Sequence, residues 1–519
     1  MISCSSFFDT PFLLALATIL VVTLFILKHK LSKTAVLNLP PGPRKLPIIG
    51  NIHHMAGDLP HRRLSHLARK YGPDVMSLQL GELSHIVIST PEAAKLVMKT
   101  HDLAFASRPY LLAADILYHG RKDIAFAPYG DHWRQMRKIC TLELFSAKRV
   151  QSFRHIREEE VSNLVASLTR SAAAGMPVDL TRMVSTVTSA ITSRAAFGKA
   201  QELTDAFMIV VDNASDVLGG FRISDLYPSF KLLPVLTGFK AKLEKMREAS
   251  DSVLDQIIDE HKARRRAAVI KDGDDDGKKE DLVDVLLNLQ ENQLDLGAPP
   301  ITMEVVKAIT LELFLAGIET STTTIGWTMS EIINDSRILQ MVQQEVRQVF
   351  GSDDEKHFDE ASLDQLNYLD MVIAESLRLH PPAPLLVPRE NVDQKVKLIS
   401  YDVPINNNVI VNVWAINRDP RYWKEAERFF PERFMSCSID YKGTDFHFIP
   451  FGAGRRMCPG VSFGMVIVKF ILANLLLHFD WTLPAGQKNI DMTECFGVTL
   501  RRQHALHLIP VSYGHVLFE

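Results

Sequence analysis

Residues 451–460 combine residue types that could do chemistry. Gly452 and Gly454 allow a tight loop and a close approach of the backbone to a flat or bulky group. Cys458 stands directly before a proline, which suits the first turn of a helix, and the apolar run over residues 461–479 predicts that helix. A sulfur at a helix N-terminus is favoured as the thiolate. The segment therefore predicts a cysteine thiolate that acts as a nucleophile or as a metal ligand.

Two cations, Arg455 and Arg456, precede Cys458 and are expected to stabilise its thiolate further. A lone cysteine is usually a small buried apolar residue. The glycines, the paired arginines and the following helix argue against that interpretation. Five cysteines, widely scattered along the chain, also argue against a disulfide framework and against a zinc site of the paired Cys-x-x-Cys type.

A second reactive pair, Glu319 and Thr320, lies inside the apolar stretch 302–334, whose spacing predicts a long helix. Gly317 in that helix costs up to about 1 kcal/mol relative to alanine, so a close contact or a groove is expected to compensate for it. A carboxyl and a hydroxyl can hold and pass protons. The alternative interpretation is a threonine-rich helix whose hydroxyls bond to earlier carbonyls.

The loop reads Phe-Gly-Ala-Gly-Arg-Arg-Met-Cys-Pro-Gly, and it resembles the haem-ligand signature of the cytochrome P450 family, Phe-Gly-x-Gly-Arg-Arg-x-Cys-x-Gly. Four further segments agree in order and spacing, so the resemblance runs from a Pro-rich stretch near residue 40 to the C-terminus. Residues 375–384, Glu-Ser-Leu-Arg-Leu-His-Pro-Pro-Ala-Pro, are similar to the plant microsomal group that oxidises terpenoids and other specialised metabolites.

This resemblance implies a haem b cofactor with Cys458 as the axial ligand of its iron. The loop residues expected at the haem are Phe451, Gly452 and Gly454. The side chains expected to donate hydrogen bonds to the haem propionates are Trp133, Arg137, Arg389 and Arg456. The resemblance also implies that Thr320 steers protons and that Glu319 supplies them.

Two further roles follow from the resemblance. Glu375 and Arg378, three residues apart on a predicted helix over 370–379, are expected to meet Arg433 in a structural node that supports the haem loop. Arg134 and Lys138, beside the face that carries Trp133 and Arg137, match a basic patch that docks an acidic reductase. Solvated charges on an amphipathic helix are the alternative for this pair.

The implied reaction is insertion of an oxygen atom from O2 into a C–H or C=C bond. Electrons would come from NADPH through a separate NADPH–cytochrome P450 reductase, since the chain has no Gly-x-Gly-x-x-Gly fingerprint. Pocket side chains implied by the resemblance include Leu311, Leu315, Leu385, Leu386 and Val498, which suit a small lipophilic substrate. A terpenoid is expected first, and a phenylpropanoid, an alkaloid or a fatty acid is the alternative.

Two other functions fit a haem-thiolate protein. One is an isomerase or dehydratase that uses no O2, and the intact threonine and cysteine loop argue against it. The other is a membrane-tethered haem protein that carries electrons or senses a ligand, which a second axial ligand from the protein would indicate.

The chain begins with an apolar run, residues 11–27, that would span roughly 25 Å as a helix. Cations follow at Lys28, Lys30 and Lys33, which favours an uncleaved anchor over a signal peptide. We therefore expect a membrane anchor over 1–33, a Pro-rich strut and linker over 34–60, and a catalytic domain over 61–519. The expected location is the endoplasmic reticulum membrane, as a single-pass protein with its catalytic domain in the cytosol.

The body is predicted to be mainly α with small β-sheets, an α+β protein with the cytochrome P450 fold behind an N-terminal transmembrane helix. Helical spacing covers 92–99, 133–144 and 150–170, and strands are expected at 75–80, 86–89, 395–399, 409–413 and 506–511. The charged insert 271–280 is expected to be a solvated loop. Lys and Arg number 58 and Asp and Glu 61, a net charge of -3 that argues against a general nucleic-acid binder.

Overall fold

The computed structural model describes residues 37–514, except 58, 199–203, 271–279, 293–298, 351–359, 393–394 and 436–438. The expected anchor, the first residues of the strut and nearly all of the charged insert lie outside the described residues. Helices dominate, as predicted. Their bounds are α2 Pro60–Tyr71, α3 Pro91–Lys95, α4 Leu112–Leu117, α5 Asp131–Ile139, α6 Ala147–Ser152, α7 Arg154–Ala173, α8 Leu180–Phe197, α9 Thr204–Val217, α10 Ile223–Leu226, α11 Leu233–Leu236, α12 Phe239–Ile270, α13 Leu282–Glu291, α14 Met303–Asn334, α15 Ser336–Phe350, α16 Asn367–Leu379, α17 Val413–Ile416 and α18 Val461–His478.

The strands form four small sheets. The largest has the order β1-β2-β7-β4, in which β2 and β7 are parallel and the other pairs antiparallel. The others are β3-β11-β8, β9-β10 and β5-β6. Their bounds are β1 Val75–Leu80, β2 Leu83–Ile88, β3 Val178–Asp179, β4 Arg389–Asn391, β5 Val396–Leu398, β6 Tyr401–Val403, β7 Asn407–Val411, β8 Phe479–Thr482, β9 Glu494–Phe496, β10 Leu500–Arg502 and β11 His507–Ser512.

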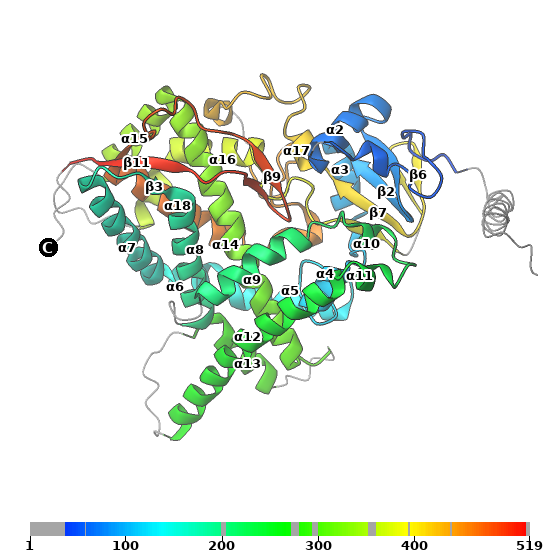
Figure 1. The fold of residues 1–519 in the computed structure, drawn as a ribbon, viewed down its shortest axis with the longest axis horizontal. Coiled ribbons are helices and arrows are strands. Elements are labelled where there is room, and N and C mark those ends of the chain that lie inside the picture. The colour runs from blue at the N-terminus through cyan, green and yellow to red at the C-terminus, as the bar shows by residue number, and fades with distance from the viewer. Residues whose placement is uncertain are drawn as a thin grey trace, which may run out of the picture.

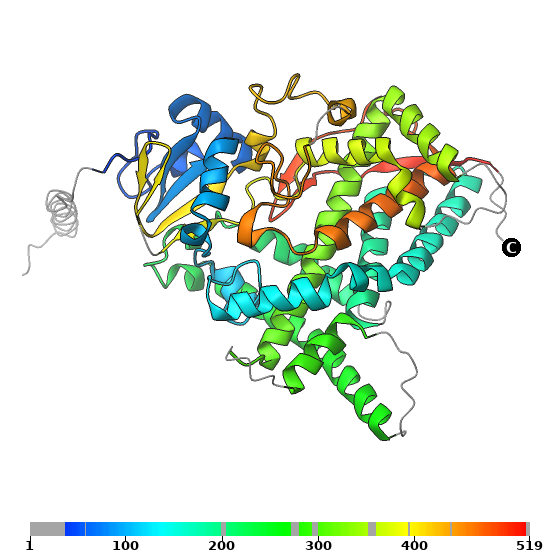
Figure 2. The ribbon, with the colours of Figure 1, turned by 180° about the vertical axis from the view of Figure 1, so that it is seen from behind.

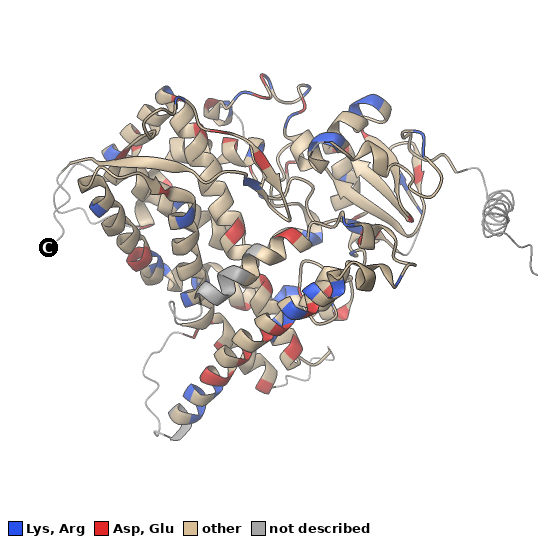
Figure 3. Ribbon diagram, viewed as in Figure 1, with Lys and Arg blue, Asp and Glu red and all other residues tan. Residues whose placement is uncertain are grey.

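The largest sheet lies at one end of the molecule with α2 and α3, and the helices form the other, larger part (Figures 1 and 2). Helix α14 runs through the middle of the helical part and packs against α8, α16 and α18. Thr302 caps it, as predicted, because its hydroxyl accepts the backbone N–H of Val305 at 3.4 Å. Charges of both signs follow one another along α12, as expected for a helix that faces solvent (Figure 3).

Three predicted helices differ in detail from the structure. The segment predicted over 92–99 is α3 followed by a π-helical turn at Leu96–Thr100, and α5 likewise ends in a π-helical turn at Cys140–Leu144. The helix predicted over 150–170 is two helices, since the chain leaves helical geometry at Phe153, between α6 and α7. Spacing alone detects a helical stretch but not a local change in its hydrogen-bond pattern.

Among the described residues, one helix is long and apolar enough to cross a membrane, namely α18, and 56% of that stretch is buried inside the protein. The main hydrophobic core includes its inner residues, among them Ile467, Ile471 and Leu475. Packing of α18 against α14 and α15 explains its apolar composition. This helix therefore belongs to the core and positions the cysteine loop that precedes it.

Candidate active site

The cysteine loop borders an internal cavity of about 270 Å³. The backbone N–H of Cys458 donates to the carbonyl of Phe451 at 3.0 Å, which closes the loop directly before α18. Gly452 and Gly454 have φ angles of +72° and +69°, in the left-handed region that favours glycine. A Cβ on Gly454 would lie 2.1 Å from the carbonyl oxygen of Met98. The predicted need for glycine in this loop is therefore confirmed.

The thiol of Cys458 is open to this cavity. Burial of the site raises the pKa of the Cys458 thiol, while the backbone N–H of Gly460 and the guanidinium of Arg137 lower it. The preceding arginines point elsewhere, since Arg455 donates to Asp102 at 3.1 Å and Arg456 to backbone carbonyls. The expectation that the preceding arginines favour the thiolate is therefore wrong; Arg137, from α5, has that role. A bound metal cation would deprotonate the thiol outright.

Helix α14 forms the opposite wall of this cavity with Ala316, Gly317 and Thr320. A Cβ on Gly317 would lie 3.2 Å from Cγ2 of Thr192, so α8 packs closely against this turn. This contact is the compensation expected for a glycine inside a helix. The hydroxyl of Thr320 donates to the carbonyl of Ala316 at 2.7 Å, and its side chain lines the cavity.

Glu319 faces a second cavity of about 210 Å³ instead of the cavity at Cys458. One carboxylate oxygen accepts hydrogen bonds from the hydroxyls of Ser215 at 2.6 Å and Thr499 at 2.5 Å, and Nε of Arg501 lies 3.6 Å from it. Thr320 lines both cavities. Glu319 and Thr320 therefore lie on adjacent faces of α14, and of the two only Thr320 lines the cavity at Cys458.

All four predicted donors line the cavity at Cys458: Trp133, Arg137, Arg389 and Arg456. The guanidinium of Arg456 donates to the carbonyls of Ala106, Ile124 and Ala127 at 2.6–2.9 Å. Trp133 also donates to the Ile124 carbonyl, at 3.1 Å, and Arg389 donates to Asp102 at 3.1 Å. The structure thus places the predicted donors along one edge of one cavity, where neighbouring backbone carbonyls hold several of them.

The sequence analysis did not identify two charged residues, Arg108 and Glu312, that line the cavity at Cys458. Glu312 accepts the backbone N–H groups of Ile124 and Ala125 at 2.6 and 2.8 Å, and burial raises its pKa to about 8. Arg108 donates to the carbonyls of Ala125 and Pro388 at 2.7 and 2.9 Å. Glu312 lies two helical turns before Glu319 on the same helix, so this spacing could have identified it as a residue that faces the cavity. The sequence around Arg108 has no comparable spacing to a predicted site residue.

The predicted pocket side chains divide into two groups. Leu315, Leu385, Leu386 and Val498 line the second cavity, as predicted. Leu311 is 2% exposed, belongs to the main hydrophobic core and lines none of the three cavities described here, so that part of the prediction is wrong. Leu386 has a φ of +50°, an unusual conformation for a leucine, at a turn that lines both cavities.

The predicted node of Glu375 and two arginines is present and buried. Arg378 donates two hydrogen bonds to the carboxylate of Glu375, at 2.7 and 2.8 Å, and Arg433 donates a third at 2.9 Å. The Glu375 and Arg378 side chains have 0% exposure. Arg378 also donates to the carbonyls of Asn417 and Ala426, both at 2.7 Å, so α16 is tied to the segment that precedes the cysteine loop.

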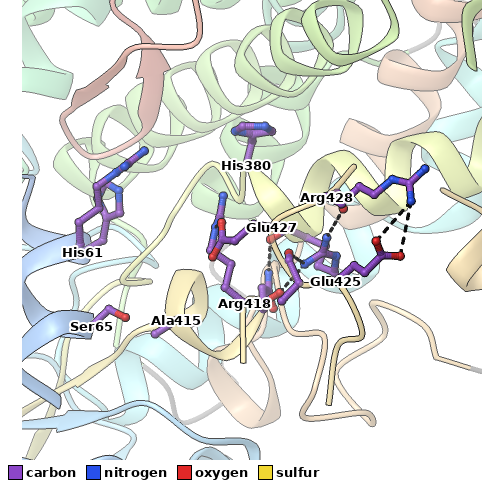
Figure 4. A network of polar contacts seen from close by, with 12 residues as sticks. His61, Ser65, His380, Ala415, Arg418, Glu425, Glu427 and Arg428 are labelled. Atoms are coloured by element: carbon purple, nitrogen blue, oxygen red, sulfur yellow. Dashed lines mark hydrogen bonds and ion pairs between the residues drawn. The ribbon is translucent and has the colours of Figure 1, made fainter. Parts of the chain in front are cut away.

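Two further ion pairs lie beside this node, since Arg378 donates to the carbonyl of Arg428 and Arg433 to that of Glu425. Figure 4 shows the side chains of these pairs. Arg428 contacts Glu425, and Nε of Arg418 lies 3.2 Å from Glu427. The Glu425 and Glu427 side chains are 53% and 71% exposed. The Arg428–Glu425 pair, exposed on both sides, contributes little to stability, whereas the Arg418 side chain is only 7% exposed.

The family model for cytochrome P450 matches residues 40–509 of this chain. The chain belongs to the cytochrome P450 family. This family comprises monooxygenases, which are oxidoreductases, and its members bind haem. The match covers the whole site described above, from the donors on α5 to the cysteine loop.

Similar proteins include enzymes named as a synthase, an oxygenase and a dihydroxylase. Desmethyl-deoxy-podophyllotoxin synthase of Sinopodophyllum hexandrum is 48% identical, over 95% of this chain and 96% of that protein. Premnaspirodiene oxygenase of Hyoscyamus muticus is 47% identical, over 94% and 96%. 5-Epiaristolochene 1,3-dihydroxylase of Nicotiana tabacum is 45% identical, over 94% and 96%. A zebra fish cytochrome P450 solved with progesterone has a TM-score of 0.73 and 26% identity, and covers 88% of this chain and 100% of that chain.

The cavity at Cys458 fits a haem of this family. Burial lowers the pKa of Arg456 to about 9, and the charges of Arg389 and Arg137 add to that shift, whereas Asp123 and Glu312 oppose it. Two carboxylates at this edge would stabilise the charged arginines, and the two propionates of haem provide them. The small residues of α14 and the open thiol leave room for a flat group between the two walls.

We predict that Glu375→Gln lowers the free energy of unfolding by roughly 3–5 kcal/mol, because it leaves the guanidinium groups of Arg378 and Arg433 buried without their carboxylate. Thermal unfolding and the ratio of bound haem to protein measure the effect. Glu425→Gln is the matched control in the exposed pair and is expected to change neither quantity appreciably. Equal melting temperatures of the two variants would contradict the structural importance of the node.

Proposed function

We propose that this protein is an NADPH- and O2-dependent monooxygenase that hydroxylates or epoxidises a lipophilic terpenoid. The observation that carries the proposal is that Cys458 and Thr320 line one cavity from opposite walls, with a cationic edge beside them. When bound to a cysteine thiolate, haem favours O–O cleavage and the transfer of one oxygen atom. Electrons would come through a separate NADPH–cytochrome P450 reductase.

The residues of the chain would bind and orient the haem. Cys458 would ligate the haem iron through its thiolate, and Phe451 and Gly452, which line the cavity, would form the floor beneath the haem. Gly454 packs against Met98 outside this lining and would act by shaping the loop. Trp133, Arg137, Arg389 and Arg456 would turn their N–H groups from backbone carbonyls toward the propionates. A propionate carries a full negative charge that a backbone carbonyl lacks, so its pairing with a buried guanidinium favours the exchange.

Proton delivery would depend on Thr320. Its hydroxyl donates to the Ala316 carbonyl, so its oxygen remains able to accept a hydrogen bond from a water in the cavity. Glu319, one residue earlier, is held by Ser215 and Thr499 and would supply protons from the side of the second cavity. Thr320 carries a hydroxyl and lines both cavities, so it is placed to pass protons between them.

The second cavity supports a lipophilic substrate. Its lining is largely aliphatic and aromatic, with Leu315, Leu385, Phe221, Phe496 and Val498 among the side chains. Premnaspirodiene oxygenase and 5-epiaristolochene 1,3-dihydroxylase carry terpenoids in their names, whereas desmethyl-deoxy-podophyllotoxin synthase names another class of metabolite. We favour a terpenoid because two of these three relatives are named for one.

The alternatives are less well supported. A haem protein that only carries electrons would use a second protein ligand opposite Cys458. In the described cavity, α14 contributes Glu312, Leu313, Ala316, Gly317, Thr320, Ser321 and Thr324, a set without histidine, methionine or lysine. An isomerase or dehydratase would not need the threonine that α14 places there.

A location at the endoplasmic reticulum membrane rests on the sequence of residues 1–33 and on the surface of the body. Exposed apolar side chains gather in the strut and in the segment between α10 and α12, namely Leu46, Ile48, Phe230, Leu232, Val235 and Leu236. Such surfaces favour contact with a membrane. The side chain of Arg134 is 56% exposed and pairs with Asp131 on α5, and with Lys138 it would form the docking patch for the reductase.

We predict that Cys458→Ser abolishes turnover and the thiolate-type carbon monoxide spectrum, because a serine hydroxyl does not replace the thiolate ligand. The spectrum of the reduced protein and a microsomal assay with reductase, NADPH and terpene hydrocarbons measure the two losses. Cys495→Ser, a cysteine outside the cavity at Cys458, is the matched control and should retain both. Retention of spectrum and activity in Cys458→Ser would place the ligand elsewhere.

Replacement of Thr320 by alanine is expected to uncouple the reaction. The substitution removes the hydroxyl that borders both cavities, so NADPH oxidation should continue while product falls and hydrogen peroxide rises. The measurement is the ratio of product to NADPH oxidised, with peroxide determined in parallel. Thr320→Ser retains the hydroxyl and should keep the ratio near that of the wild type. An unchanged ratio in Thr320→Ala would show that this threonine is only a helix residue.

Deletion of residues 2–33 should release much of the protein from microsomes while haem stays bound, because every proposed haem contact lies at Trp133 or beyond. Fractionation and the haem absorbance measure both results. A truncated protein that folds but binds no haem would contradict the division into anchor and catalytic domain.

A further inference from the structure

A third cavity, of about 60 Å³, continues the other two toward the largest sheet. Val387 lines all three cavities, and Phe221 and Ile410 line both the second and the third. The three spaces therefore meet around Val387, and a long guest could extend from the cavity at Cys458 into the third cavity. We call this third space the outer chamber.

The outer chamber contains a buried carboxylate whose oxygens make no well-formed hydrogen bond. Asp225, on α10, is 9% exposed, and neither of its oxygens has a hydrogen-bond partner among the described residues. Burial raises its pKa to about 6, although the backbone N–H groups of Arg222 and Leu112 lie close enough to oppose the shift. A buried acceptor without a donor is costly, which points to a donor supplied by a ligand.

The neighbouring polar side chains are largely occupied, although Nε of Arg222 also has no hydrogen-bond partner among the described residues. Nδ1 of His85 lies 3.2 Å from the carbonyl of Leu83, and its Nε2 lies 3.4 Å from Nδ2 of Asn408. Burial lowers the pKa of His85 to about 4, so the ring is neutral at pH 7. The guanidinium of Arg222 lies 4.7 Å from the ring centre of Phe239 and donates to the carbonyl of Asp216 at 3.1 Å. Asp225 is thus the acceptor of the outer chamber that a ligand can satisfy.

We infer that the outer chamber binds a hydroxyl group on the far end of the substrate, with Asp225 as its acceptor. This inference rests on the proposed function. A hydroxyl fits better than an ammonium group, because the buried cation Arg108 lines the same chamber and would repel a second positive charge. A carboxylate fits poorly because, when ionised, it has no proton to donate to Asp225 and its charge would face that of Asp225. Asp225 is therefore a specificity-determining residue, and the substrate is a terpenoid that already carries a hydroxyl.

This assignment places the enzyme in a sequence of reactions. The hydroxyl at the outer end must be introduced before this enzyme acts, so an earlier oxygenation or a hydrolytic release of an alcohol must supply the substrate. The new oxygen would be inserted at the opposite end, near Cys458. The product would then carry oxygen at two distant positions.

Equilibrium dialysis of the holoenzyme tests the inference, with three diterpenes that differ at one carbon: abietadiene, abietadienol and abietic acid. The sesquiterpene pair valencene and nootkatol serves as a smaller probe. We expect at least one alcohol to bind about tenfold more tightly than its hydrocarbon, and abietic acid to bind more weakly than abietadienol. In Asp225→Leu this preference for the alcohol should disappear while the hydrocarbon binds at least as tightly.

The matched control is Asp216→Asn, an exposed acid that pairs with Arg501 and lines none of the three cavities. Asp216→Asn should retain the preference for the alcohol.

Asp225→Leu should also melt no lower than the wild type, since it removes a buried charge that has no hydrogen-bond partner. A lower melting temperature would show instead that Asp225 is a structural partner of Arg222. Absence of the preference in the wild type, its survival in Asp225→Leu, or no binding of any probe would overturn the inference. The carbon monoxide spectrum and the uncoupling of Thr320→Ala test the proposed function separately, since neither depends on Asp225.

Discussion

Buried guanidinium groups need acceptors for their N–H groups, and this requirement fixes the walls of the active site. Arg456 joins the cysteine loop to three carbonyls between Ala106 and Ala127. Arg108 joins that same segment to the carbonyls of Val387 and Pro388. Arg378 joins α16 to the chain near Asn417 and Ala426. Each arginine thus ties together segments that lie far apart in the sequence, and the cavity at Cys458 is the space that these ties enclose.

The same arrangement gives the cavity its charge. Most of these acceptors are neutral carbonyls, so the hydrogen bonds are satisfied while the positive charges remain only partly balanced. Burial and the neighbouring guanidinium groups accordingly lower the pKa values of Arg108 and Arg456. A dianionic group at this edge would restore the balance. The structural ties and the proposed affinity for haem propionates therefore have one physical origin.

Local motifs were sufficient to predict part of the site, because a short loop or one helical turn determines it. The glycine loop, the cysteine before α18, the capping of α14 by Thr302 and the position of Thr320 are of this kind. Contacts between segments that lie far apart in the sequence could not be predicted from local motifs. Arg455 turns to Asp102, more than 350 positions earlier, and Glu319 turns to Ser215 and Thr499. Spacing assigns a residue to a helix face, but the partner depends on which element packs there.

The partners of Glu319 link the proposed proton supply to the proposed substrate cavity. Ser215 and Thr499 line the second cavity themselves, so a substrate in that cavity would lie against the two hydroxyls that hold the acid. Arg501, 31% exposed, connects the same carboxylate to Asp216 at the surface. Any shift of α9 or of the 496–499 turn that accommodates a substrate therefore also changes the hydrogen bonds of Glu319. If the proposed roles hold, substrate fit and proton delivery depend on the same residues, Ser215 and Thr499, and a change of either residue would affect both.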